Sequence, residues 1–254
     1  MTRIPLWGSL ISVLLLTLAG GALADQRFFV WTYESKTVSP GEAEVETYFT
    51  LATPDRGSFE GQTSTQHQVE LEVGMTKRFD FGIYQVFSQA PGGTLGYDGF
   101  KLRARYRMGG AGQPRLDPVA YLEYKGKPDL SEHGIEAKII LTHTFGRYCL
   151  ALNPIAELDV EDGGWELEPE YAVGLSYGVG RLLRVGVEVK GSGSGHYLGP
   201  VIFHGTDRLW MTLGSAVGIA GVHAGSPQLQ LRALLGVNLV APPSAGVRTP
   251  PPDA

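Results

Sequence analysis

The chain has 254 residues, of which 19% are charged, and a formal net charge of −5. With a mean hydropathy of −0.02 it is too apolar for a disordered chain, and its acidic balance provides no basic surface for nucleic acid. The single cysteine, Cys149, excludes an intramolecular disulfide framework. We therefore expect a folded protein without a nucleic-acid partner.

The N-terminus has the three parts of a secretory signal. Basic Arg3 precedes an apolar run over residues 10–18, and the small-residue site Ala22-Leu23-Ala24 follows. The run is shorter than the ~20 residues that a spanning helix needs, which disfavours a membrane anchor. We predict a cleaved signal peptide over residues 1–24 and export from the cytoplasm.

From residue 42 onward, segments of roughly ten residues alternate polar and apolar side chains and are separated by Gly, Pro, Asp and Ser clusters. In the first of them, Glu42, Glu44 and Glu46 fall on one face of a strand, opposite Ala43 and Val45. The pattern predicts twelve antiparallel strands, over residues 42–53, 66–76, 80–89, 99–108, 118–126, 133–145, 147–159, 165–178, 181–191, 196–205, 208–219 and 227–240.

The connections between these strands alternate in length. Long connections such as 54–65 and 90–98 alternate with short turns such as 77–79, whereas 109–117 is longer than its position predicts. Long outer loops and short periplasmic turns are typical of outer-membrane barrels, with both chain ends in the periplasm. The predicted fold class is all-β: an antiparallel up-and-down transmembrane β-barrel of about 12 strands, over residues 42–240, in a bacterial outer membrane.

The segments that flank the barrel lack the alternation. Residues 25–41 include an apolar stretch, but Pro40-Gly41 and an even strand count favour a lead-in that lies in the periplasm or in the lumen. Residues 241–254 are rich in proline, which predicts a disordered tail.

Lipid is the expected surrounding of this barrel, because its apolar face lasts nearly the whole length of each strand and closure leaves no unpaired sheet edge. Aromatic side chains near the strand ends suit the two membrane interfaces, although strand propensity also explains them. The residues assigned to these girdles are Tyr48, Phe49, Phe79, Phe81, Phe87, Tyr97, Phe100, Phe145, Tyr148, Trp165, Tyr177, Tyr197 and Phe203.

The polar face of the strands carries many charges, which we expect to line the lumen. The candidates are Glu42, Glu44, Glu46, Glu70, Glu72, Arg103, Arg105, Arg107, Glu166, Glu168, Glu170, Arg184, Glu188 and Arg232. Acidic and basic patches on opposite walls would create a transverse field that selects polar solutes. Alternatively, they pair and fill the lumen, because twelve strands lie between the ~8 that side chains fill and the ~16 that leave a channel.

Residues 29–35, Phe-Val-Trp-Thr-Tyr-Glu-Ser, and residues 40–46, Pro-Gly-Glu-Ala-Glu-Val-Glu, resemble uncharacterised Gram-negative outer-membrane barrels. These barrels are loosely related to transporter-like proteins of phenol-degradation operons. The match is strongest over residues 27–53 and diffuse afterwards. The resemblance implies a porin-like or transport role and provides no catalytic residue.

The leading functional hypothesis is a porin-like channel or transporter for small polar or amphipathic solutes. A non-conducting structural or interaction barrel is the alternative. A membrane lipid hydrolase is disfavoured, because no serine stands at a motif spacing from His67, His143, His196 or His204. We expect no enzyme activity, no cofactor and no metal site. The expected partners are outer-membrane lipid and lipopolysaccharide, the barrel-assembly machinery and a small-molecule solute.

Overall fold

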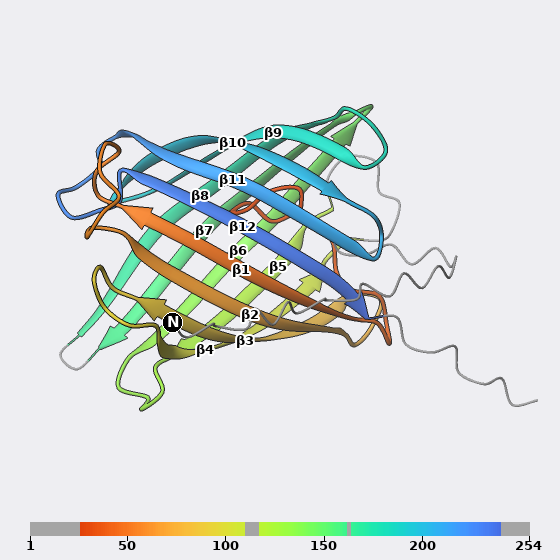
Figure 1. Ribbon diagram of the computed structural model, residues 1–254. Helices are drawn as coiled ribbons and strands as arrows, with labels where there is room; N and C mark the ends of the chain where they lie inside the picture. The colour runs from red at the N-terminus through yellow and green to blue at the C-terminus, as the bar shows by residue number, and fades with distance from the viewer. Residues whose placement is uncertain (1–25, 110–116, 162–163, 240–254) are drawn as a thin grey trace, which may run out of the picture.

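The computed structural model describes residues 26–109, 117–161 and 164–239. They form a closed antiparallel barrel in which each strand pairs with its neighbours in sequence and the last strand pairs with the first (Figure 1). The strands are β1 (Ala43–Thr53), β2 (Ser64–Gly74), β3 (Phe79–Gln89), β4 (Gly96–Arg107), β5 (Val119–Gly126), β6 (His133–Phe145), β7 (Tyr148–Glu161), β8 (Gly164–Gly178), β9 (Leu183–Ser192), β10 (Gly195–Gly205), β11 (Leu209–Ala220) and β12 (Leu229–Leu239).

The predicted fold class is therefore confirmed, and each of the twelve predicted strands overlaps an observed one. The largest difference between a predicted and an observed strand boundary is at the start of β4, which begins at Gly96 and not at residue 99. None of the described residues form a helix that is long and apolar enough to cross a membrane. The predicted signal peptide, the tail over 241–254 and most of the 109–117 connection lie outside the described residues.

Alternate side chains of each strand face outward, and the outward ones are largely apolar. On β10, Leu198 and Ile202 are 41% and 43% exposed, whereas their neighbours Tyr197 and Phe203 are buried. Similar exposed apolar side chains lie on the other strands. An apolar surface of this extent is unfavourable in water, so the outer face of the barrel contacts lipid.

The predicted aromatic girdles are wrong for three residues. Tyr48, Tyr197 and Phe203 are buried inside the barrel, whereas Phe49 and Tyr148 are exposed on the outside. The reason is the two-residue period of a strand: Tyr48 shares its face with the inward-facing Glu44 and Glu46, whatever its distance from the strand end.

The barrel has two different ends. We call the end that carries the connections 54–63, 90–95, 127–132 and 221–228 the loop end. The opposite end carries 75–78, 146–147, 179–182 and 206–208, and we call it the turn end. β1 begins and β12 ends at the turn end.

Acidic and basic side chains meet on one wall of the barrel, in what we call the glutamate–arginine cluster. Arg103 Nη1 of β4 lies 2.9 Å from Glu70 Oε1 and 2.7 Å from Glu72 Oε1 of β2. All three side chains are fully buried. Asp80 and Arg105 belong to it through ion pairs, and Glu44 and Glu46 through carboxylate oxygens within 4.8 Å of one from Glu72.

Strand β3 lies between these partners, and Gly82 makes their contact feasible. The register places Gly82 between Glu72 and Arg103. A Cβ atom at Gly82 would stand 2.5 Å from Glu70 Oε1 and 3.2 Å from Arg103 Nε, so a larger residue would occupy the space of the ion pairs. Glu70 and Glu72 of the acidic patch therefore pair with Arg103 and Arg105 of the basic patch along one wall, and the two patches do not face each other across a pore.

Replacing Arg103 by leucine is expected to lower the free energy of unfolding by about 3–5 kcal/mol, because Glu70 and Glu72 lose a buried cationic partner. Urea titration of the protein in lipid vesicles, followed by tryptophan fluorescence, measures this change. Arg78→Leu, in the exposed 75–78 turn, is the control and should change the value by less than about 0.5 kcal/mol. Equal effects of the two substitutions would contradict the stabilising role of the buried ion pairs of Arg103.

Candidate functional site

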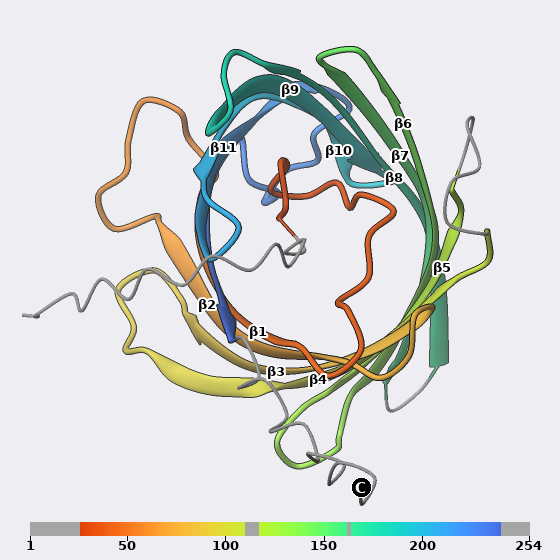
Figure 2. The ribbon, with the colours of Figure 1, turned by 90° about the vertical axis from the view of Figure 1, so that its right-hand side faces the viewer.

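Residues 26–42, which we call the plug segment, lie inside the barrel and cross its lumen (Figure 2). The segment starts at the turn end, where Gln26 Nε2 donates to Asp207 Oδ1 over 3.4 Å. It returns there through Val38, whose amide donates to Asp80 Oδ2 over 2.9 Å, and continues into β1. The plug segment is therefore an inward excursion with both of its ends at the turn end.

Glu188 of β9 holds the innermost part of the plug segment. Its Oε2 accepts from the amide of Val30 over 2.9 Å, and its Oε1 accepts from the amides of Trp31 and Thr32 over 3.0 and 2.8 Å. Successive backbone amides that converge on one carboxylate form a favourable anion site. Glu188 was a candidate pore charge, but the structure uses it to anchor the plug segment.

The backbone beyond Thr32 is held by polar side chains of the wall. Asn153 accepts from the Tyr33 amide over 2.6 Å and donates to the Tyr33 carbonyl over 3.0 Å. The Ser35 amide donates to Thr142 Oγ1 over 2.8 Å, and Arg107 Nη2 donates to the Ser35 carbonyl over 2.9 Å. These bonds replace the water that the backbone would otherwise need, so irregular chain is stable inside the barrel.

Two glycines make room for the plug segment in the wall. A Cβ atom at Gly174 of β8 would stand 2.6 Å from the Phe29 ring, and one at Gly214 of β11 would stand 2.5 Å from Val30 Cγ2. Both distances are shorter than real side chains tolerate. Phe29 and Val30 are accordingly fully buried and close this part of the lumen.

Between the plug segment and the loop end lies a cavity of about 550 Å³, which we call the vestibule. Arg27, Trp31 and Tyr33 of the plug segment line its floor, and its lining extends to residues such as Lys127 and Ser194 at the loop end. Its volume lies within the range of about 300–1,000 Å³ that is usual for small-molecule sites. The vestibule is therefore large enough for a small solute.

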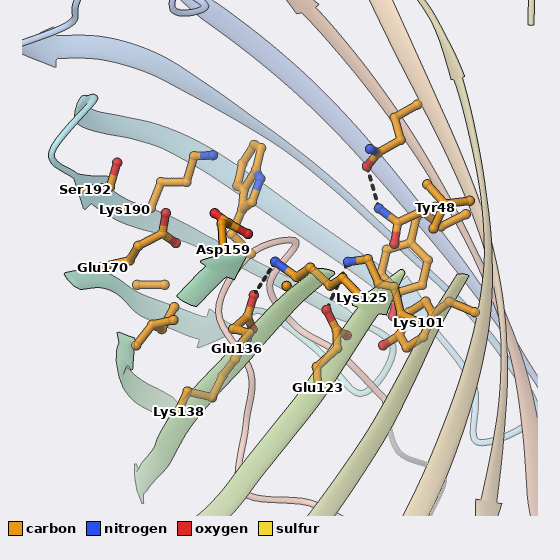
Figure 3. A pocket seen from close by; sticks show the side chains of 18 of the residues that line it. Tyr48, Lys101, Glu123, Lys125, Glu136, Lys138, Asp159, Glu170, Lys190 and Ser192 are labelled. Carbon is orange, nitrogen blue, oxygen red and sulfur yellow. Dashed lines mark hydrogen bonds and ion pairs between the residues drawn. The ribbon is translucent and has the colours of Figure 1, made fainter. Parts of the chain in front are cut away.

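Ion pairs cover one side of the vestibule (Figure 3). Lys101 Nζ lies 3.1 Å from Glu123 Oε1, and Lys125 Nζ lies 3.2 Å from Glu136 Oε2. At the loop end Lys127 donates to Asp98, and this hydrogen bond raises the pKa of Lys127. None of these side chains was among the sequence candidates, which were chosen mainly in runs of one charge sign. The polar–apolar alternation of the predicted strands 118–126 and 133–145 could have identified Glu123, Lys125 and Glu136 as inward-facing.

The structure brings some of the sequence candidates together and separates others. Six of them belong to the glutamate–arginine cluster, namely Glu44, Glu46, Glu70, Glu72, Arg103 and Arg105. Four contact the plug segment, namely Arg107, Arg184, Glu188 and Arg232. Glu170 and Arg232 line the vestibule, whereas Glu166 and Glu168 do not, and Glu42 lies half-buried at the end of the plug segment.

A cation has one candidate site within the described part of the chain. One carboxylate oxygen from each of Glu44, Glu46 and Glu72 lies within 4.8 Å of the others. However, Glu44 accepts from Trp210 Nε1, and Glu72 is paired with both arginines of the cluster. These carboxylates therefore already have partners in the wall.

The histidines do not form a hydrolase site in the described ranges. The imidazoles of His67 and His143 lie against the rings of Phe49 and Phe145, and His196 hydrogen bonds with a tyrosine hydroxyl. Across residues 26–109, 117–161 and 164–239 no hydrogen bond joins a histidine side chain to a serine hydroxyl or a carboxylate. The described histidines therefore form no nucleophile–base pair with a serine or a carboxylate.

No family model and no curated protein matches this chain. Among solved structures, it is similar to an outer membrane channel from Pseudomonas putida F1, at 11% identity and a TM-score of 0.58 over 81% of this chain and 98% of that one. It is also similar to the KdgM porin in complex with disordered oligogalacturonate, at 7% identity and 0.55 over 78% and 99%. A third similar structure is the NanC porin, at 5% identity and 0.53 over 78% and 100%. At these identities the likeness establishes the barrel fold.

Glu188→Leu is expected to loosen the plug segment, because three backbone amides lose their acceptor at once. Hydrogen–deuterium exchange of a peptide covering residues 28–35 should accelerate by about tenfold or more. Glu166→Leu, an exposed site on the neighbouring strand, serves as the control and should leave the rate unchanged. Unchanged exchange in Glu188→Leu would show that the anchor is not needed.

Proposed function

We propose that the protein is a porin-like channel for small polar solutes in a bacterial outer membrane, with the plug segment as its constriction. The vestibule carries this proposal: it is a polar cavity of about 550 Å³ inside a closed transmembrane barrel, and it reaches from the loop end to the plug segment. A barrel whose wall side chains filled the lumen would leave no such cavity. The similar solved structures, a channel and two porins, support the proposal.

In this proposal a solute enters from the loop end and is held in the vestibule above Trp31 and Tyr33. Passage then requires displacement of the plug segment, because Phe29 and Val30 are fully buried against the wall. Hydrogen bonds hold the segment, and both of its ends lie at the turn end, so it can withdraw in that direction while β1 stays paired.

The remaining parts of the chain complete the proposal. Residues 1–24 direct export and are removed, and residues 241–254 form a tail at the periplasmic side. Outer-membrane lipid and lipopolysaccharide surround the barrel, and the barrel-assembly machinery inserts it. The resemblance to transporter-like proteins of phenol-degradation operons is compatible with a transport role and identifies no solute for this chain.

A non-conducting structural barrel is the second candidate, and the anchoring of the plug segment favours it. The amides of four successive residues, Val30 to Tyr33, donate to Glu188 and Asn153 of the wall. If this anchoring is permanent, the plug segment blocks the vestibule from the turn end, and only the loops of the barrel are available for interactions. Conductance separates the two candidates.

In planar lipid bilayers, the purified protein is expected to form a small ion-conducting pore. Deletion of residues 27–37 should raise the single-channel conductance severalfold, because it removes the material that crosses the lumen. Deletion of residues 243–254 is the control and should leave the conductance unchanged. Heat-modifiable gel migration verifies that each barrel is folded. A folded wild-type barrel without any conductance would contradict the channel and favour the structural role.

A further inference from the structure

The vestibule contains two positive charges without a carboxylate partner. Seven lysine and arginine side chains line it, and five lie within 4.0 Å of a carboxylate, namely Arg27, Lys101, Lys125, Lys127 and Lys138. The other two, Lys190 of β9 and Arg232 of β12, have no such partner among the described residues. Lys190 and Arg232 therefore lack the carboxylate partner that each of the other five cations of the vestibule has.

Neutral oxygen atoms hold both of these side chains in place. Lys190 Nζ donates to Gln230 Oε1 over 2.8 Å, and Arg232 Nε donates to Thr50 Oγ1 over 2.8 Å. Arg232 Nη1 also donates to the Val30 carbonyl over 3.4 Å. These bonds orient the two cations without neutralising them.

The two cations lie around one indole ring of the plug segment. Lys190 Nζ is 4.9 Å from the centre of the Trp31 ring, and the Arg232 guanidinium carbon is 5.3 Å from it. The Trp31 Nε1–H is itself buried and has no hydrogen-bond partner. An unpaired buried donor is costly, and here it lies beside two cations that have no carboxylate partner within 4.0 Å.

The two nearby carboxylates, Glu188 and Glu170, form no ion pair with Lys190 or Arg232 within 4.0 Å. Glu188 is used by three backbone amides of the plug segment. Glu170 projects into the pocket from the neighbouring strand β8 and lies near Lys190 in the close view (Figure 3), but it forms no ion pair with Lys190 within 4.0 Å. Two like charges placed close together in a partly desolvated cavity favour a bound anion.

We propose that Lys190 and Arg232, with the indole N–H of Trp31 beside them, bind the carboxylate group of a small solute at the floor of the vestibule. A carboxylate supplies two acceptor oxygens for ammonium and guanidinium donors, and such charge-assisted bonds are the strong ones. This inference deepens the proposed channel function by naming the class of solute. Binding is measurable without transport, so the two proposals can fail separately.

The test compares an acid with its neutral amide, using butyrate and butyramide as probes. Isothermal titration calorimetry of the full-length detergent-solubilised protein should detect butyrate and not butyramide. Lys190→Gln and Arg232→Gln should each weaken butyrate binding about tenfold or more, because each removes a charged donor. Lys77→Gln, in the exposed 75–78 turn, is the matched control and should bind butyrate like the wild type.

Three results would overturn the carboxylate site: no butyrate binding by the wild type, equal binding of butyramide, or unchanged binding in both glutamine variants. The comparison of acid and amide uses the wild-type protein, so it decides the matter even if a variant does not fold. Butyrate binding by a barrel that conducts no ions would support the site and contradict the channel. Conductance without butyrate binding would support the channel and contradict the carboxylate site.

Discussion

The pairing of β1 with β12 is the constraint on which the rest of the structure depends. It closes the sheet along the full length of both strands, from Ala43 opposite Leu239 to Thr53 opposite Leu229. Closure leaves no unpaired backbone edge in lipid, and it divides every strand into an inner and an outer face. The alternation of side chains therefore places apolar side chains in lipid and polar side chains in an enclosed lumen.

An enclosed lumen makes charge compensation the next requirement. Seven charged side chains form the glutamate–arginine cluster near the turn end, and all seven are buried. Glycine at position 82 permits their contact across β3, since any side chain there would enter the space of the ion pairs. Nearer to the loop end the same requirement is met by ion pairs between adjacent strands, such as Lys101 of β4 with Glu123 of β5. Lys190 and Arg232 depart from this rule, which is why they point to a ligand.

The plug segment connects the closure of the barrel to its function. It leads directly into β1, so the strand that closes the sheet also tethers the segment that obstructs the lumen. Its contacts with the wall include hydrogen bonds to Glu188 and Asn153 and close packing against glycines, and none of these contacts belongs to the strand pairing that closes the barrel. In the proposed channel, the strands of the wall stay paired while the plug segment moves.

The sequence by itself determined the strands, their antiparallel order and the face on which each side chain lies. These properties depend on the two-residue period and on turn residues, which act between near neighbours in the chain. That is why the alternation assigned Glu72, Arg103 and Glu188 to the interior. Tyr48 was misplaced only where distance from the strand end was given more weight than this period.

Only the tertiary structure decided which of the inner side chains meet. Arg103 pairs with Glu72 because the registers of β2, β3 and β4 align them on either side of Gly82. Glu188 meets the plug segment although 156 positions separate it from Thr32. Contacts of this kind arise from closure and from the path of residues 26–42 through the lumen, and no local pattern encodes either, because each joins chain segments that only the closed barrel brings together.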